Sequence, residues 1–146
     1  MEPHTSVVQT HEDALDMVEQ VGADNIAICL DPPLLAIHKE DVIKAVGDLM
    51  VHAHIMDFVR KPVLVEYHYL PGLSISEFIP LETIPLGEGE VPIKEYIEAC
   101  KRIGYKGHIS YEVCVPFHFK HRKPTLSDVD KLVEHAVKYL RKLISD

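Results

Sequence analysis

The six residues Met50-Val51-His52-Ala53-His54-Ile55 have the alternating pattern of a β-strand. Side chains of a strand point to opposite faces in turn, so His52 and His54 lie on the same face. The segment Asn25-Ile26-Ala27-Ile28-Cys29-Leu30-Asp31 alternates large aliphatic residues with small ones, and Gly107-His108-Ile109-Ser110-Tyr111-Glu112-Val113 has a similar form. These three segments predict strands that each have one apolar and one more polar face.

Helical patterns separate the three predicted strands. Thr10 and Asp13 have the spacing of an N-terminal capping box, and Gly22 is typical of a helix end. Further helices are expected over residues 39–49, from Pro92 to the stop at Gly104, and from a capping-box-like start at Thr125 and Asp128 through Ile144. Residues 57–89 include Pro62, Pro71 and Pro80 and predict only an extended insertion or a short strand followed by a loop.

Alternation of helices and strands indicates an α/β protein with a parallel sheet. Each predicted strand ends in a polar side chain on one face, namely Asp31, His54 and Glu112. In a barrel of parallel strands the active site forms at the carboxyl ends of the strands. We therefore expect these three side chains to meet at one rim.

Composition excludes several classes of protein. The chain has 146 residues, of which 47% are hydrophobic and 26% are charged, as in globular domains. Its formal charge of -8 is opposite to that of a nucleic-acid-binding protein, so nucleic acid is not expected as a partner. No apolar run is long enough to span a membrane, and the N-terminus lacks the features of a signal peptide. Three widely spaced cysteines fit a reducing, cytoplasmic location.

Two carboxylates and an imidazole form a donor set that suits Mn²⁺ or Mg²⁺, with Co²⁺ or Zn²⁺ as alternatives. Each of the three residues also has an ordinary structural interpretation. A strand-terminal Asp commonly caps the loop or helix that follows, and a His often lies on the surface or in the core. The recurrence of polar groups at the same strand position is what favours a metal site.

Four segments together resemble the sugar phosphate isomerase/epimerase family of xylose-isomerase-like TIM barrels. They are Leu30-Asp31-Pro32, Val51-His52-Ala53-His54-Ile55-Met56-Asp57, Pro85-Leu86-Gly87-Glu88-Gly89-Glu90-Val91 and Ile109-Ser110-Tyr111-Glu112. The start, Met1-Glu2-Pro3-His4, resembles the family's Glu-(Asn/Pro)-His motif. The resemblance covers almost the whole chain but only about half of the barrel. It implies the C-terminal half of a TIM barrel, roughly strands five to eight with their helices, as a single partial-barrel domain over residues 1–146.

The family resemblance also implies a site and a reaction. Family members bind one divalent cation through a Glu, an Asp, the second His of an HxH motif and a Glu, which correspond here to Glu2, Asp31, His54 and Glu112. Glu2 and Glu112 would be the acid/base pair of a metal-dependent sugar or sugar phosphate isomerase or epimerase. The reaction would pass through an enediolate, with Mn²⁺ as the first choice of cation.

Further residues near these motifs are candidate substrate ligands. His52 lies one inward step from His54, Asp57 completes the HxH-x-x-Asp motif, and Arg60 follows shortly after. The sequence also departs from the family, because Leu34 stands where ketohexose epimerases often have a His.

A complete barrel of this class needs at least about 200 residues. A parallel half would expose strand edges and the apolar interior, so we expect pairing with another copy of the chain or with a missing N-terminal half. Two alternatives stay open beside the isomerase. The chain could be a non-catalytic or truncated half-barrel that acts as an assembly partner, or a metal hydrolase like endonuclease IV, although the charge of -8 disfavours a DNA track.

Overall fold

The computed structural model describes residues 8–47, 49–61, 63–70, 73–79, 81–113 and 124–145, with backbone only for 63–70 and 73–79. Its elements, in chain order, are α1 (His11–Val21), β1 (Ile28–Leu30), α2 (Pro32–Ile37), β2 (Met50–Ile55), β3 (Asp57–Val59), β4 (Val63–Leu70), β5 (Leu73–Ile79), β6 (Glu82–Ile84), α3 (Ile93–Arg102), β7 (His108–Tyr111) and α4 (Leu126–Ser145). No helix in these ranges combines the length and apolar character needed to cross a membrane.

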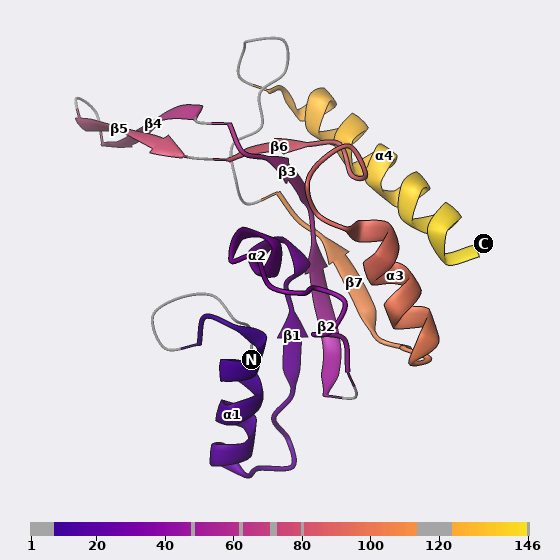
Figure 1. Cartoon of the computed structure of the whole chain (residues 1–146). Helices are drawn as coiled ribbons and strands as arrows, with labels where there is room; N and C mark the ends of the chain where they lie inside the picture. The colour runs from indigo at the N-terminus through magenta and orange to yellow at the C-terminus, as the bar shows by residue number, and fades with distance from the viewer. Residues whose placement is uncertain are drawn as a thin grey trace.

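A parallel sheet of three strands, in the order β1-β2-β7, forms the centre of the molecule (Figure 1). Leu30 of β1 aligns with Ala53 of β2, and His54 of β2 aligns with Ser110 of β7. Parallel alignment brings the carboxyl ends of all three strands to one edge. The α/β class with a parallel sheet, as predicted from the sequence, is confirmed.

One face of the sheet packs into the hydrophobic core. Leu30, Ala53 and Ile55, which are at most 1% exposed, lie in one buried cluster with residues of all four helices. Figure 1 shows α1 beside β1, and α3 with α4 beside β7. Because side chains alternate along each strand, burial of this face leaves the opposite face to carry the polar residues.

Three of the four predicted helices are confirmed, and the capping bonds predicted for α1 and α4 are present. Thr10 and Asp13 form a full capping box at the start of α1, and Gly22 ends that helix with a φ of 60°. Residues 93–102 form α3. At the start of α4, the Thr125 amide donates to the Asp128 carboxylate and the Asp128 amide donates to the Thr125 hydroxyl.

The helix predicted over residues 39–49 is wrong. Helix α2 lies earlier, because Asp31 caps it through a bond from the Leu34 amide (3.0 Å) and two prolines occupy its first positions. Lys39 has a φ of 61°, which ends the helical path. Further on, Asp41 Oδ1 accepts bonds from two nearby amides and holds residues 42–45 in turns.

Between β2 and α3, the described strands form two antiparallel pairs instead of a further parallel strand. β3 pairs with β6, and β4 pairs with β5 in a hairpin that extends away from the parallel sheet (Figure 1). As a result, the strand that carries His54 lies directly beside the strand that leads to Glu112. In the part of the chain that the structure describes, the half-barrel thus contains three parallel strands, one fewer than predicted.

Candidate metal centre at the carboxyl edge of the sheet

Asp31, His54 and Glu112 meet at the carboxyl edge of the parallel sheet. One ligand atom from each lies within 4.8 Å of those of the other two. Asp31 directly follows β1, His54 is the penultimate residue of β2 and Glu112 directly follows β7. Three of the four ligand positions predicted from the sequence are therefore brought together. The fourth, Glu2, lies outside the described residues.

Asp31 has a structural contact in addition to its place in the cluster. It is 3% exposed, and its Oδ1 accepts the Leu34 amide at 3.0 Å as the N-cap of α2. Leu34, at the position where the family resemblance predicts a His, thus belongs to the turn that fixes this carboxylate. The capping role and the ligand role are compatible, since a carboxylate has two oxygens and about four lone-pair positions.

His54 and Glu112 face each other across neighbouring strands. His54 Nδ1 lies 3.6 Å from Glu112 Oε2, and the two side chains are 28% and 31% exposed. The Glu112 amide donates to the Ile55 carbonyl at 3.1 Å, so β2 still holds the backbone of Glu112 after β7 has ended. Both side chains are within reach of solvent and of a ligand at this edge.

This donor set fits a divalent cation. Two carboxylates and one imidazole are ligands that Mn²⁺, Mg²⁺ and related ions accept, and they leave positions for substrate oxygens. The partial exposure of His54 and Glu112 provides a path for an ion to enter.

His52 lies on the same face of the sheet as His54, two residues earlier on β2 and farther from the carboxyl edge. Its Nε2 is 3.0 Å from the Ser110 hydroxyl, and its ring meets the His54 ring edge-on at a centroid distance of 5.3 Å. Cys29 lies beside His52 as its partner in the β1–β2 ladder. Cys29 was not among the site residues predicted from the sequence, although it comes two residues before Asp31 and so falls on the same face of the alternating pattern.

Asp57 shapes the loop of residues 85–91. Its side chain is fully buried, Oδ1 accepts the amides of Phe58 and Val91, and Oδ2 accepts those of Gly87 (2.9 Å) and Gly89 (2.8 Å). A β-carbon at Gly89 would collide with this carboxylate. These contacts explain why the glycine-rich motif occurs together with the HxH-x-x-Asp motif. Substrate binding by Asp57 stays a prediction, because its contacts are those of a residue that holds a loop.

Arg60 is tied to the same loop. Its guanidinium pairs with Glu90, donates to the Ala36 carbonyl at 3.0 Å and lies 5.6 Å from the centre of the Phe58 ring. The Arg60 amide also bonds to Glu90 and is the main cause that lowers the pKa of the Glu90 carboxyl. Substrate binding by Arg60 stays a prediction.

Comparison with protein families identifies the fold. The family model described as xylose isomerase-like TIM barrel matches residues 1–143. The chain belongs to this family. The resemblance inferred from the four motifs is therefore confirmed. No curated protein sequence matches the chain.

Solved structures agree with the family assignment. D-allulose 3-epimerase from Methylomonas sp. superposes with a TM-score of 0.66 at 21% identity, over 97% of this chain and 47% of that one. D-psicose 3-epimerase from Clostridium cellulolyticum H10 gives 0.69 at 19% identity, over 99% and 48%. A xylose isomerase domain protein from Alicyclobacillus acidocaldarius gives 0.62 at 20% identity, over 97% and 45%. The chain thus has this fold and spans about half the length of the structures it matches.

Proposed function

We propose that this chain provides the metal-binding edge of a sugar or sugar phosphate isomerase or epimerase. The observation that carries the proposal is the meeting of Asp31, His54 and Glu112 within 4.8 Å at the carboxyl edge of the sheet. In barrels of parallel strands this edge is where catalytic residues collect. The similar solved structures include 3-epimerases of D-allulose, D-psicose and L-ribulose.

Four residues of the chain have a defined part in the proposed reaction. Asp31, His54 and Glu112, with Glu2 as the fourth ligand, hold a divalent cation, for which Mn²⁺ is our first choice and Mg²⁺, Co²⁺ or Zn²⁺ the alternatives. When bound, the cation polarises the substrate carbonyl and a neighbouring hydroxyl. Glu112 exchanges a proton with the carbon next to that carbonyl, and Glu2 acts from the other side of the enediolate.

Binding of the sugar is assigned to residues around this edge. His52 lies one register step inward, and its bond to Ser110 fixes the orientation of its ring. Arg60 is 45% exposed and carries a charge that suits a hydroxyl or phosphate. The soluble, cytoplasmic environment expected from the sequence suits a small polyhydroxy substrate.

A second candidate function is that of an assembly partner. The chain spans only about half the length of its structural neighbours, and both outer strands of the described parallel sheet, β1 and β7, have one edge without a strand partner in that sheet. A second copy or an N-terminal half of the barrel would cover those edges. The alternative of a metal hydrolase like endonuclease IV has no comparable support, because the net charge of -8 opposes binding to DNA.

Solvent proton exchange tests the proposed chemistry. The metal-loaded, fully assembled protein is incubated in deuterium oxide with a panel of ketoses and ketose phosphates, and deuterium next to the carbonyl is measured by NMR. We expect wash-in that Glu112→Gln abolishes, because this change removes both a ligand charge and a base. Glu88→Gln, an exposed change in the 85–91 loop, is the matched control and should retain exchange. Persistence of wash-in in Glu112→Gln, or none with the wild type across the panel, would leave only the assembly function.

A further inference from the structure

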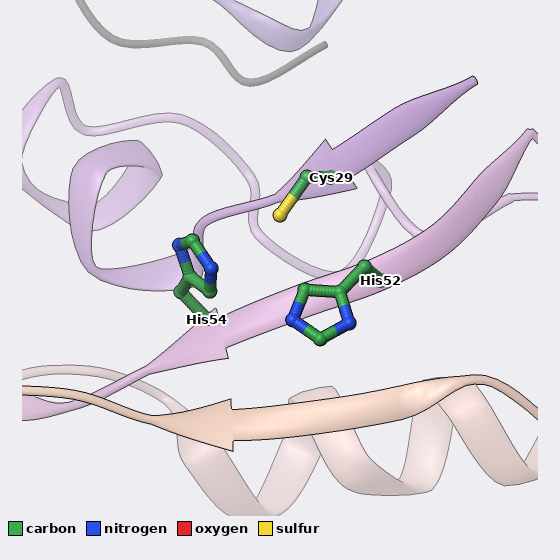
Figure 2. A group of neighbouring side chains, drawn as sticks. All are labelled: Cys29, His52 and His54. Atoms are coloured by element: carbon green, nitrogen blue, oxygen red, sulfur yellow. The ribbon is translucent and has the colours of Figure 1, made fainter. Parts of the chain in front are cut away.

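A second group of metal-binding side chains lies next to the proposed cation site. Cys29, His52 and His54 each offer one ligand atom, and these atoms lie within 4.8 Å of one another (Figure 2). All three side chains are partly buried. Figure 2 shows Cys29 projecting from β1 toward the two imidazoles of β2. His54 belongs to this group and also to the group with Asp31 and Glu112.

Strand register explains why the three side chains meet. Cys29 and His52 are aligned partners in the β1–β2 ladder, and His54 follows His52 by two residues on the same face. Side chains aligned in this way project from neighbouring strands in the same direction, so a thiol and an imidazole stand side by side. The β1–β2 register shifts between Ile28 and Cys29, and after this shift Cys29 aligns with His52, so all three donors come from paired strands and not from loops.

The Ser110 hydroxyl orients one of the three ligands. It lies 3.0 Å from His52 Nε2, so a metal bond from this imidazole would come from Nδ1. A ligating His commonly bonds a polar group through its other ring nitrogen, which fixes the orientation of the ring. Ser110 therefore has the place of such an orienting residue, on the strand opposite to that of Cys29.

The donor chemistry of the two groups differs. A thiolate with two imidazoles favours Zn²⁺ and similar borderline ions, and three protein ligands plus one open position is a common zinc geometry. The carboxylates of Asp31 and Glu112 favour harder ions such as Mn²⁺ or Mg²⁺. One ring of His54 cannot serve both groups equally, so an ion in one position weakens the other.

We propose that Cys29, His52 and His54 form a second metal site, selective for Zn²⁺-like ions, one step inward from the proposed Mn²⁺ site. Zn²⁺ bound there draws His54 away from Asp31 and Glu112 and so competes with Mn²⁺. The site itself does not depend on the proposed sugar chemistry, and only the competition rests on the proposed function.

Cobalt spectroscopy tests for the thiolate ligand. Co²⁺ is titrated into the full chain, and the absorption band of charge transfer from thiolate to Co²⁺ is recorded. We expect the band in the wild type and its loss in Cys29→Ser. Cys100→Ser and Cys114→Ser are matched controls that remove the other two cysteines and should retain it. Circular dichroism checks that every variant is folded, and His52→Gln supplies a second variant that should weaken the band if Cys29→Ser does not fold.

Substitutions of the two carboxylates and of Cys29 distinguish the two metal sites. Asp31→Asn and Glu112→Gln should retain the cobalt–thiolate band while they weaken Mn²⁺ binding, whereas Cys29→Ser should weaken Zn²⁺ at least about tenfold and leave Mn²⁺ affinity unchanged. In the wild type, Zn²⁺ should displace Mn²⁺, measured by the electron paramagnetic resonance of released Mn²⁺. A band unchanged in Cys29→Ser, or lost equally in Asp31→Asn, would overturn the second site. If no divalent cation binds in a way that Asp31→Asn and Glu112→Gln weaken, while the cobalt band is intact, the proposed function is overturned and the second site stands.

Discussion

His54 contributes to both candidate metal sites, and its position follows from simple strand geometry. Its ring faces Glu112 at 3.6 Å on one side and the His52 ring on the other. Replacement of this one side chain therefore tests more of the site than any other single change.

His54→Ala should reduce Mn²⁺ affinity at least about tenfold, because it removes the only nitrogen ligand of the proposed site and leaves two carboxylates that repel each other. Isothermal titration calorimetry measures the affinity. His108→Ala is the matched control, since His108 is an exposed imidazole at the start of β7 and should leave affinity unchanged. Equal affinity for Mn²⁺ in the wild type and in His54→Ala would show that the site is wrongly assigned.

Tyr111 lies one residue before Glu112 and has a buried hydroxyl with no hydrogen-bond partner in the described part of the chain. Tyr111→Phe should leave the free energy of unfolding at pH 7 unchanged or raise it by up to about 1 kcal/mol, since no bond is lost. The matched control is Tyr105→Phe, which removes the bond from the Tyr105 hydroxyl to the His108 carbonyl (3.0 Å) and should cost about 1 kcal/mol. Urea denaturation distinguishes the two, and a larger loss in Tyr111→Phe than in Tyr105→Phe would contradict this prediction.

Burial, aided by the charge of Asp57, raises the pKa of Tyr111 to about 12. The unfolded chain releases this proton near pH 10, so stability from this group is complete below that pH and is lost as the pH rises toward 12. Tyr111→Phe should therefore show a shallower fall of stability between these values, measured by urea denaturation at a series of alkaline pH values. Parallel curves for the variant and the wild type would contradict this assignment.

At the scale of elements, the loop of residues 85–91 depends on Asp57. Each carboxylate oxygen accepts two backbone amides, so Asp57→Asn would set an NH₂ group against two donors that have no other acceptor at that position. We expect a loss of about 2–5 kcal/mol of unfolding free energy, from two buried amides left without acceptors. Glu88→Gln in the same loop is exposed and should change stability by less than about 0.5 kcal/mol. Similar urea midpoints for the two variants would contradict this role of Asp57.

Local signals located some elements well and others poorly. Thr10, Gly22 and Thr125 identify helix ends because capping bonds form between residues three or four apart, and α1 and α4 begin or end as expected. The predicted helix over residues 39–49 failed because Asp31 and two prolines start a helix earlier, and the turn at Lys39 ends it. The pairs β3–β6 and β4–β5 were missed because partners in β3–β6 lie far apart in the sequence and prolines obscured the strand pattern.

On the scale of the whole molecule, the described chain exposes apolar side chains on α4 and leaves one edge of each outer strand of the parallel sheet without a strand partner in that sheet. Helix α4 exposes Val129, Val133 and Val137 at helical spacing, each 36–39% exposed, and β1 and β7 form the outer strands of the parallel sheet. Burial of such surfaces in an assembly is favourable by about 25 cal/mol per Å².

The chain should therefore associate in solution, either with another copy of itself or with an added N-terminal half of the barrel. Association with another copy gives a mass by light scattering of at least twice the 16.5 kDa of one copy. Val133→Glu should lower the measured mass, because a charge is costly in an apolar interface. Lys131→Glu, an exposed change two residues earlier on the same helix, is the control and should not. A monomer at high concentration for the wild type would contradict this prediction.

The sequence by itself determined the periodic strands, the capped helices and the family motifs, because alternation, capping and turn chemistry act over a few residues. It therefore placed Asp31, His54 and Glu112 at the ends of strands and indicated a common edge. Tertiary structure alone decided that β2 and β7 are neighbours, that Asp57 binds the 85–91 loop and that Cys29 lies beside His52. These outcomes depend on contacts between residues 23 to 56 positions apart, from Cys29 with His52 to His52 with His108, and their register is set by packing of the whole sheet and not by local preference.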